Sequence, residues 1–203
     1  GWGMGVTQQA QGVQTVRALA ALALVTGHIG RPNSGLAPVR GQNNVQGSCD
    51  MGMWPSLYPG YQRVDDPAVR AKFAAAWGVP EERLSLKEGY KLTDLPHAVA
   101  GGRIRAFYSF GEDPLQTEPD TAQMRRTLES LDLLISQDIF MTQTTALADV
   151  VLPVSTSLEH EGIVTFHGCN QPGQFHALTQ VLEPLGECKS DLQIMLDLDH
   201  RIN

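Results

Sequence analysis

Apolar residues near the start of the chain repeat at the spacing of an α-helix. From Val13 to Leu24 they recur at intervals of three and four residues and form one wide stripe. Thr7 suits the N-cap of this helix, and Gly27 suits the turn that ends it. Because the glycine-rich segment 1–6 directly precedes the helix, the pattern predicts a strand end, a tight turn and a helix, which is half of an α/β crossover.

The most regular alternation of strand and helix patterns lies in the second half of the chain. The predicted strands are 104–110, 133–136 and 149–153, and the predicted helices between them are 120–131 and 142–148. Strands that alternate with helices form a parallel sheet. The fold class is therefore α/β, with a parallel sheet flanked by helices.

Shorter periodic segments complete the prediction. They are helices 67–76, 94–100 and 190–202, strands 162–166 and 175–182, and loops 54–64 and 84–90. Pro67 suits the first turn of its helix and Gly78 its end, while Ser190 suits the N-cap of the last helix.

Two polar, glycine-rich segments, 27–35 and 38–52, follow one another without apolar periodicity. Loops of this length in compact domains are usually functional or disordered. The second segment carries Arg40 among side-chain amides and contains no low-complexity repeat. We predict an ordered loop that holds a polar ligand.

Composition restricts the class of partner. The chain has 203 residues, of which 42% are hydrophobic, and a formal net charge of −7, which together indicate a globular protein and exclude a general nucleic-acid role. Cys49, Cys169 and Cys188 are far apart and form no CxxC pair, which fits a reducing compartment and predicts a cytoplasmic location. The apolar stretch 13–25 is too short to span a bilayer, and no signal peptide is visible, so no membrane segment is expected.

Arg40 is the strongest candidate for binding an anion. Its planar guanidinium can hold a carboxylate or phosphate through two hydrogen bonds, whereas the alternatives are a surface arginine or a pair with Asp50. The amides that follow it offer donors and acceptors for the edge of a heterocycle, but such loops are also simply solvated. These amides are Gln42, Asn43, Asn44 and Gln46.

The carboxyl ends of the predicted parallel strands place several polar segments on one rim, where ligands bind in open α/β sheets. These segments are 111–113, 137–138 and the residues after Leu152. For Asp113 and Asp138 the alternative to ligand binding is capping of their own loops. Glu159, His160 and Glu161 suggest a metal or acid–base cluster, but adjacent residues share no face, so a structural role is favoured.

The first glycines admit two interpretations as well. Segment 1–5 can be a turn that needs positive φ angles, or a close approach of the backbone to a phosphate at a helix N-terminus. It is not GxGxxG, so an NAD site is not supported.

Several motifs, taken together, resemble the molybdopterin oxidoreductases, and most closely the catalytic subunit of molybdenum- or tungsten-dependent formate dehydrogenases. In chain order the motifs are GMGVTQ at 3–8, TGHIGRP at 26–32, PVRGQNNVQG at 38–47, YPGY at 58–61, GEDP at 111–114, QDIFMT at 137–142, ADVVLP at 148–153 and EHEG at 159–162. The resemblance covers nearly the whole chain.

The resemblance implies two molybdopterin guanine dinucleotides around one molybdenum or tungsten, at the junction of two Rossmann-like domains. Residues 1–40 would end one lobe, and 41–203 would form a second lobe that binds a guanine dinucleotide. Met4, Gly5, Thr7 and Gln8 would line one of the cofactors, and Gln42 would lie close to the pterin. Gly111, Glu112, Asp113, Gln137, Asp138, Thr142 and Asp149 would flank the dinucleotide.

By the same resemblance, Arg40 matches the arginine that lies by the metal and orients formate. The family's Cys or Sec metal ligand and its [4Fe–4S] cysteines lie upstream of everything matched here, and none of the three cysteines corresponds to them. After Gly162 the family usually has an arginine that this chain lacks, which weakens the expected dinucleotide contact there.

We therefore expect a fragment of a formate dehydrogenase that is inactive alone. Its partners would be formate, further domains of the same subunit and electron-transfer subunits, and exposed surfaces around 1–6 and 51–61 would favour self-association. The alternatives are another bis-pterin oxidoreductase, such as a nitrate reductase relative, and a truncated non-catalytic α/β module.

Overall fold

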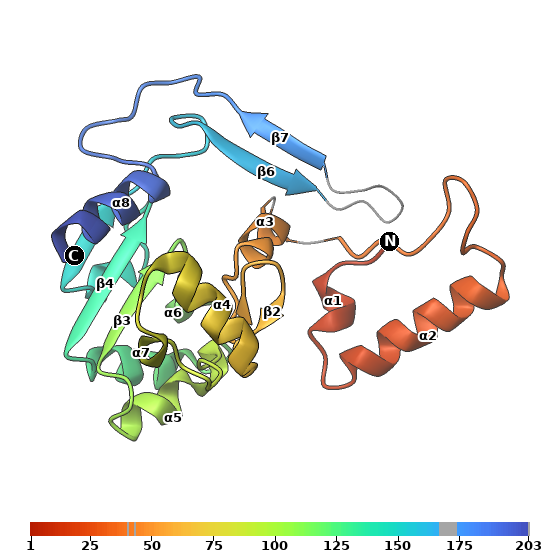
Figure 1. Cartoon of the computed structure of the whole chain (residues 1–203), viewed down its shortest axis with the longest axis horizontal. Coiled ribbons are helices and arrows are strands. Elements are labelled where there is room, and N and C mark those ends of the chain that lie inside the picture. Colours follow the sequence, from red (N-terminus) through yellow and green to blue (C-terminus); the bar gives the residue numbers. More distant parts are fainter. Residues whose placement is uncertain (40, 43, 167–173, 203) are drawn as a thin grey trace. The chain divides into compact units, whose positions relative to one another are not determined.

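The computed structural model describes residues 1–39, 41–42, 44–166 and 174–202, and divides into two compact units. One comprises Gly1–Glu81 with Ile163–Ala177, and the other Glu82–Gly162 with Leu178–Asn203. The boundaries of these units differ from the predicted boundary between two cofactor-binding lobes after residue 40. The two lobes describe cofactor binding, and they stay a prediction. Each unit is described below by itself (Figure 1).

The first unit is built mainly from helices. They are α1 (Met4–Thr7), α2 (Gly12–Val25), α3 (Val45–Asp50) and α4 (Pro67–Trp77), together with a short hairpin of β1 (Leu57–Tyr58) and β2 (Gln62–Arg63). The rings of Tyr58 and Phe73 stack at 4.7 Å between centroids, and Trp77 lies 5.0 Å from Phe73. This aromatic cluster packs the hairpin against α4.

Local sequence signals explain where α4 begins and ends. Asp66 accepts a hydrogen bond from the N–H of Ala68 at 2.9 Å, and Pro67 occupies the first helical position. Gly78 ends the helix in the left-handed conformation with φ 67°. Pro67 and Gly78 are the residues at which the sequence predicts the helix to start and stop, and the structure adds the Asp66 cap.

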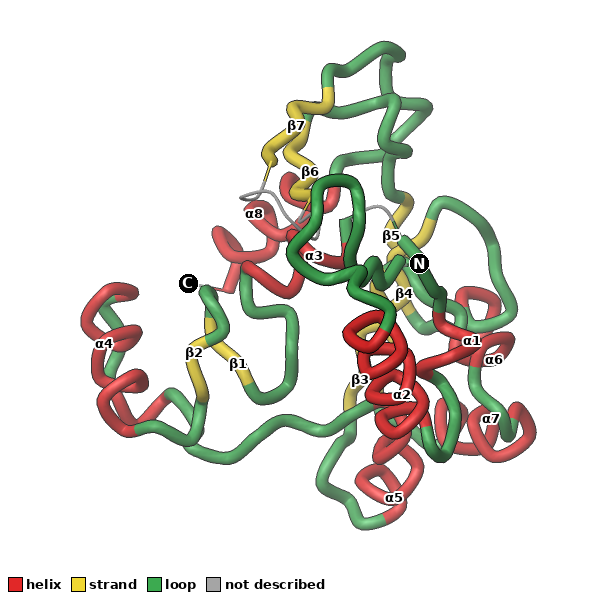
Figure 2. Tube along the Cα trace, turned by 90° about the vertical axis from the view of Figure 1, so that its right-hand side faces the viewer, coloured by secondary structure: helices red, strands yellow, loops and turns green. Residues whose placement is uncertain are grey.

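The second unit contains a parallel sheet in the order β3–β4–β5. Its elements are η2 (Leu92–Asp94), α5 (Leu95–Ala100), β3 (Ala106–Phe110), α6 (Pro114–Thr117), α7 (Thr121–Glu129), β4 (Leu133–Asp138), η3 (Thr145–Leu147), β5 (Val150–Pro153) and α8 (Asp191–Ile202). Neighbouring strands of this sheet are hydrogen-bonded, and β4 and β5 can be followed in the turned view (Figure 2). The parallel sheet that the alternating pattern predicts is confirmed.

The two faces of this sheet carry different side chains, because successive residues of a strand alternate. Leu134 packs on one face with Leu95, Leu115, Met124 and Leu128 in a core formed by α5, α6 and α7. Gln137 lies on the opposite face and binds the first residue of α8. At the carboxyl ends, Phe110, Gln137 and Leu152 align in register across the strands.

Three short connecting elements complete the structure. η1 (Glu81–Arg83) follows α4, and β6 (Gly162–Phe166) and β7 (Gln174–Leu178) form a two-stranded sheet.

Several boundaries differ from the sequence prediction. Thr7 is not the N-cap of the long helix, since it ends α1 and its hydroxyl donates to the carbonyl of Met4, while α2 begins only at Gly12. The polar loop contains α3, and segment 54–64 contains the β1–β2 hairpin. Of helix 142–148 only the 3₁₀ turn Thr145–Leu147 forms.

Candidate cofactor site

The turn around α1 lies beside the chain segment that leads into the long polar loop. The N–H of Trp2 donates to the carbonyl of Ala37 at 3.0 Å, and the N–H of Val39 donates to the carbonyl of Trp2 at 2.8 Å, so the two segments pair in parallel. A cavity of about 180 Å³ lies here, lined by Trp2, Gly3, Met4, Thr7, Pro38 and Val39. Met4 and Thr7 are therefore brought together, whereas Gly5 and Gln8 do not line this cavity.

The indole N–H of Trp2 is buried, and no described residue accepts a hydrogen bond from it. A buried donor without an acceptor costs about 1–3 kcal/mol. A group with acceptor atoms, such as a pterin, would satisfy this donor, so the residues here fit such a group.

The amides of the polar loop have separate partners. Gln42 is exposed, whereas Arg40 and Asn43, including the possible Arg40–Asp50 pair, lie outside the described residues. Asn44 donates to the carbonyl of Ile163 at 3.1 Å. Gln46 donates to Asp50 at 2.9 Å and to the Tyr61 hydroxyl at 2.5 Å, so it ties α3 to the hairpin.

In the second unit, the loop after β3 is fixed by hydrogen bonds from the sheet and from η3. Gly111 has φ 61°, and its N–H donates to the carbonyl of Gln137 at 2.9 Å. Glu112 accepts from the Thr117 hydroxyl at 2.6 Å. Asp113 Oδ1 accepts from both the N–H and the hydroxyl of Thr144, at 3.0 and 2.6 Å. These three residues lie together at the carboxyl end of β3.

The loop after β4 is also capped by its own side chains. Asp138 Oδ1 accepts from the N–H of Phe140 at 3.0 Å, and the hydroxyls of Thr142 and Thr145 are 2.8 Å apart. The capping interpretation therefore describes one oxygen of Asp138, whereas Asp113 makes no cap in its own loop and uses one oxygen to bind Thr144 of the next loop. The second oxygen of each makes no hydrogen bond to a described residue.

Gln137 lies at the same end of the sheet but is only 1% exposed. The Tyr108 hydroxyl donates to its Oε1, and its Nε2 donates to Asp191 Oδ1 at 2.6 Å. The sequence predicts neither Tyr108 nor Asp191 as a partner of Gln137. Asp191 directly follows Ser190, the predicted N-cap, and that position was the only signal for it.

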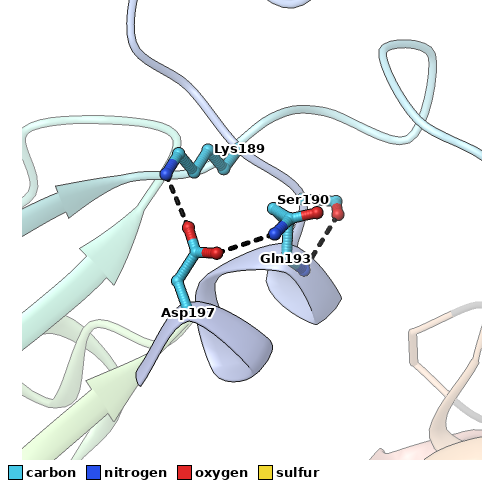
Figure 3. Close-up of polar contacts among 4 residues, drawn as sticks. All are labelled: Lys189, Ser190, Gln193 and Asp197. Carbon is cyan, nitrogen blue, oxygen red and sulfur yellow. Dashed lines mark hydrogen bonds and ion pairs between the residues drawn. The ribbon is translucent and has the colours of Figure 1, made fainter. Parts of the chain in front are cut away.

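Helix α8 holds Asp191 at this rim. Ser190 Oγ accepts from the N–H of Gln193 at 3.2 Å, which confirms the predicted N-cap. Asp197 binds Lys189 Nζ at 2.6 Å and Gln193 Nε2 at 2.8 Å (Figure 3). These contacts tie the start of the helix to its second turn.

Asp149 lies at the other end of the sheet. It directly precedes β5, and its Oδ2 accepts from the N–H of Leu134, the second residue of β4, at 2.7 Å. The structure therefore does not bring Asp149 together with residues 111–113 and 137–138. These residues lie at the carboxyl ends of β3 and β4, an edge that we call the carboxyl rim.

The Glu159–Glu161 cluster is engaged in structural contacts. His160 Nδ1 lies 3.1 Å from Ser155 Oγ. Glu159 accepts from the N–H groups of Thr156 and Leu185, and the Thr156 N–H holds the pKa of this carboxyl below its usual value. Within the described part of the chain, no three His, Cys, Asp or Glu side chains meet in a metal site.

The donor and acceptor types at the carboxyl rim fit one part of a guanine dinucleotide. Carboxylates accept hydrogen bonds only, so Glu112, Asp113 and Asp138 match the N–H groups of a guanine base and the hydroxyls of a ribose. They do not match a pyrophosphate, which is itself an acceptor. The rim therefore fits the nucleoside end of such a cofactor.

A parallel sheet with an acidic carboxyl rim is typical of nucleotide-binding α/β proteins. Comparison with known families narrows this class, because the model of the family described as "Molybdopterin oxidoreductase" matches residues 1–201. The chain belongs to the molybdopterin oxidoreductase family.

Two of the curated relatives of this chain have the name formate dehydrogenase. The chain is 51% identical over 201 residues to "Formate dehydrogenase H" of Escherichia coli (strain K12), covering 99% of this chain and 27% of that protein. It is 41% identical over 192 residues to "F420-dependent formate dehydrogenase 1 subunit alpha" of Methanococcus maripaludis, covering 95% of this chain and 27% of that protein. The chain thus spans about a quarter of the length of these relatives.

Among solved structures, the chain is similar to "Acetylene Hydratase from Pelobacter acetylenicus". The TM-score is 0.50 at 26% sequence identity, covering 75% of this chain and 21% of that one. No helix among the described residues is long and apolar enough to cross a membrane.

Proposed function

We propose that this chain is part of the catalytic subunit of a molybdenum- or tungsten-dependent formate dehydrogenase. The reaction converts formate to CO₂, one proton and two electrons. The observation that carries the proposal is the 51% identity to "Formate dehydrogenase H" of E. coli across 99% of the chain. The run PVRGQNNVQG at 38–47 supports formate as the substrate.

Arg40 is the residue that we assign to the substrate. A guanidinium binds a carboxylate through two parallel hydrogen bonds and so orients formate with its C–H bond in a defined direction. The product CO₂ carries no charge, so Arg40 binds substrate in preference to product. A bound metal–pterin group would supply the acceptor for the two electrons of the C–H bond.

The cofactor in this proposal is bis-molybdopterin guanine dinucleotide, and its two ends meet different parts of the chain. The cavity beside α1 supports a pterin contact by Met4 and Thr7. We assign Gly5, Gln8 and Gln42 to the same cofactor from the family resemblance of their motifs. The carboxyl rim supports a guanosine contact by residues 111–113, Asp138 and Thr142. Asp149 acts in this proposal through the sheet, by holding the start of β4.

The remaining partners follow from the same assignment. The electrons would leave through a [4Fe–4S] centre and electron-transfer subunits, none of which this sequence supplies. A cytoplasmic location fits the sparse cysteines, of which Cys49 and Cys188 are free thiols.

The test uses a full-length protein that contains this chain. We expect turnover of formate but not nitrate with a viologen dye, together with pterin and molybdenum or tungsten in the purified protein. Arg40→Lys should lower kcat/KM for formate about a hundredfold, because a lysine cannot form the two parallel hydrogen bonds.

The matched control is Arg103→Lys. Arg103 lies 5.4 Å from the Tyr90 ring centroid, away from the rim residues, and should leave kcat/KM unchanged. Turnover of nitrate instead of formate would reject the proposal, and so would turnover of formate by the isolated 203-residue chain.

A further inference from the structure

Tyr108, Gln137 and Asp191 form a continuous hydrogen-bonded chain from β3 through β4 to α8. The Tyr108 hydroxyl contacts Gln137 Oε1, and Gln137 Nε2 lies 2.6 Å from Asp191 Oδ1. Because Gln137 is buried, its amide cannot exchange these partners for water. Both of its polar atoms are satisfied by the protein.

The chemistry of the three groups determines where each proton lies. A carboxylate only accepts, so the NH₂ group of Gln137 must face Asp191. The amide oxygen then faces Tyr108, and because this oxygen has no proton, Tyr108 must donate. The phenol oxygen is left with lone pairs only, and the part of the chain that the structure describes offers it no other hydrogen bond.

We propose that Tyr108 is a positioning residue of the carboxyl rim. Asp191 fixes the orientation of the Gln137 amide, and Tyr108 gives its proton to the amide oxygen, so both ends of Tyr108–Gln137–Asp191 offer only acceptors and select the donor edge of a nucleobase. This inference rests on the proposed function, because it concerns the guanosine end of the cofactor. It assigns base selection to a residue of β3 that acts through a buried amide.

The surrounding residues reinforce this selection. Asp113 and Asp138 lie at the same end of the sheet and also present carboxylate oxygens. Guanine offers N1–H and an NH₂ group on one edge, whereas adenine has an acceptor at N1. These carboxylates and the Tyr108 oxygen form the acceptor-only part of the rim, which binds guanine and leaves adenine with unfavourable contacts.

The ionisation of Tyr108 is consistent with its role as a donor. Burial raises the pKa of the Tyr108 phenol above its usual value, and the negative charge of Asp191 raises this pKa further. Tyr108 therefore keeps its proton throughout the neutral range.

The first experiment measures equilibrium binding of guanosine and adenosine 5′-monophosphates to the 203-residue chain. We expect the unaltered chain to prefer the guanosine nucleotide by about tenfold, since one matched hydrogen bond has about this effect. Tyr108→Phe should lose the preference. Tyr90→Phe is the matched control and should keep it, because Tyr90 is 47% exposed and contacts Arg103 through its ring.

Two outcomes of this experiment would overturn the proposal in different ways. If Tyr108→Phe keeps the preference, Tyr108 does not select the base, although the rim does. If the unaltered chain shows no preference, the acceptor-only rim itself is wrong. Neither outcome involves metal, pterin or formate, so both are distinguishable from failure of the proposed function.

A second measurement needs no variant. In an NMR titration of the unaltered chain to alkaline pH, the Gln137 side-chain NH₂ signals should shift when Tyr108 loses its proton, because a phenolate cannot donate to Oε1. Unchanged Gln137 signals through the titration of Tyr108 would overturn the proposed order of protons.

Discussion

At the residue scale, Gly52 and Gly27 show two physical reasons why a position requires glycine: a positive φ angle alone, and a positive φ angle together with a close backbone neighbour. Both have positive φ, 84° and 67°, but a Cβ on Gly52 would lie 2.7 Å from the backbone nitrogen of Pro59, whereas a Cβ on Gly27 would meet nothing within 4 Å. We predict that Gly27→Ala lowers the free energy of unfolding by about 1 kcal/mol through backbone strain alone. Gly52→Ala should lower it by about 3 kcal/mol, because the hairpin turn that follows β1 must also move. Urea unfolding of both variants measures the difference.

The control for this pair is Gly3→Ala. Gly3 has φ −107°, and a Cβ there meets nothing within 4 Å, so the change should stay within about 0.5 kcal/mol of zero. Equal losses for Gly52→Ala and Gly27→Ala would show that the close approach to Pro59 is not significant.

At the scale of elements, α8 is sensitive to acid through Asp197. The hydrogen bond from Lys189 lowers the pKa of Asp197, and that from Gln193 lowers it further. A lowered pKa in the folded state stabilises at pH values above the unfolded pKa, and this stabilisation is lost as the pH falls through the folded pKa. We predict that the unfolding free energy decreases over this acidic range, and that Lys189→Met reduces the decrease.

Acid titration of the unfolding free energy at low and high salt tests this prediction. The pair is exposed, so its contribution should shrink at high salt. Lys87→Met is the matched control, because among the described residues the Lys87 side chain has no ion pair. The same acid dependence in the Lys189 variant and the unaltered chain would contradict the prediction.

The elements that the sequence predicts well are those whose signals are local. Helix α4 has its proline, its Asp66 cap and its Gly78 stop within the segment itself, and β4 begins with the apolar run Leu133–Ile135. Helices α1 and α3 have four and six residues and no side-chain cap, so no periodicity marks them. Such short helices form because their neighbours pack on them.

The sequence predicts which loops form the rim of the sheet, but it does not predict the side-chain contacts within that rim. The rule for parallel sheets places the loops after β3 and β4 on one rim without any coordinates. Which side chains face a ligand there depends on contacts between distant residues. Gln137 pairs with residues 29 and 54 positions away, and Asp113 with one 31 positions away, and no local pattern encodes such pairs.

At the scale of the whole molecule, exposed apolar side chains predict self-association. Leu22 and Val25 of α2 are 60% and 85% exposed, and Met51 and Trp54, within the segment expected to associate, are 71% and 50% exposed. Patches of this kind favour contacts between copies. We predict that sedimentation shows species larger than a monomer, and that the double variant Leu22→Glu, Val25→Glu reduces them.

A double variant with the same change in charge is the control. Gln11→Glu, Gln14→Glu alters exposed polar positions of the same region and should leave association unchanged. A single monomeric species of the unaltered chain at high concentration would show the prediction to be wrong.

The division into two units also has a consequence for the order of folding. In the second unit β3 pairs with β4 over 27 positions (106 to 133), and β4 with β5 over 15 (135 to 150). The first unit is closed by Ile163–Ala177, and its Asn44–Ile163 hydrogen bond spans 119 positions. Closing a longer loop costs more entropy, so the sheet forms before this contact. During synthesis from the N-terminus, the half of the chain that is made first is therefore the half that finishes folding last.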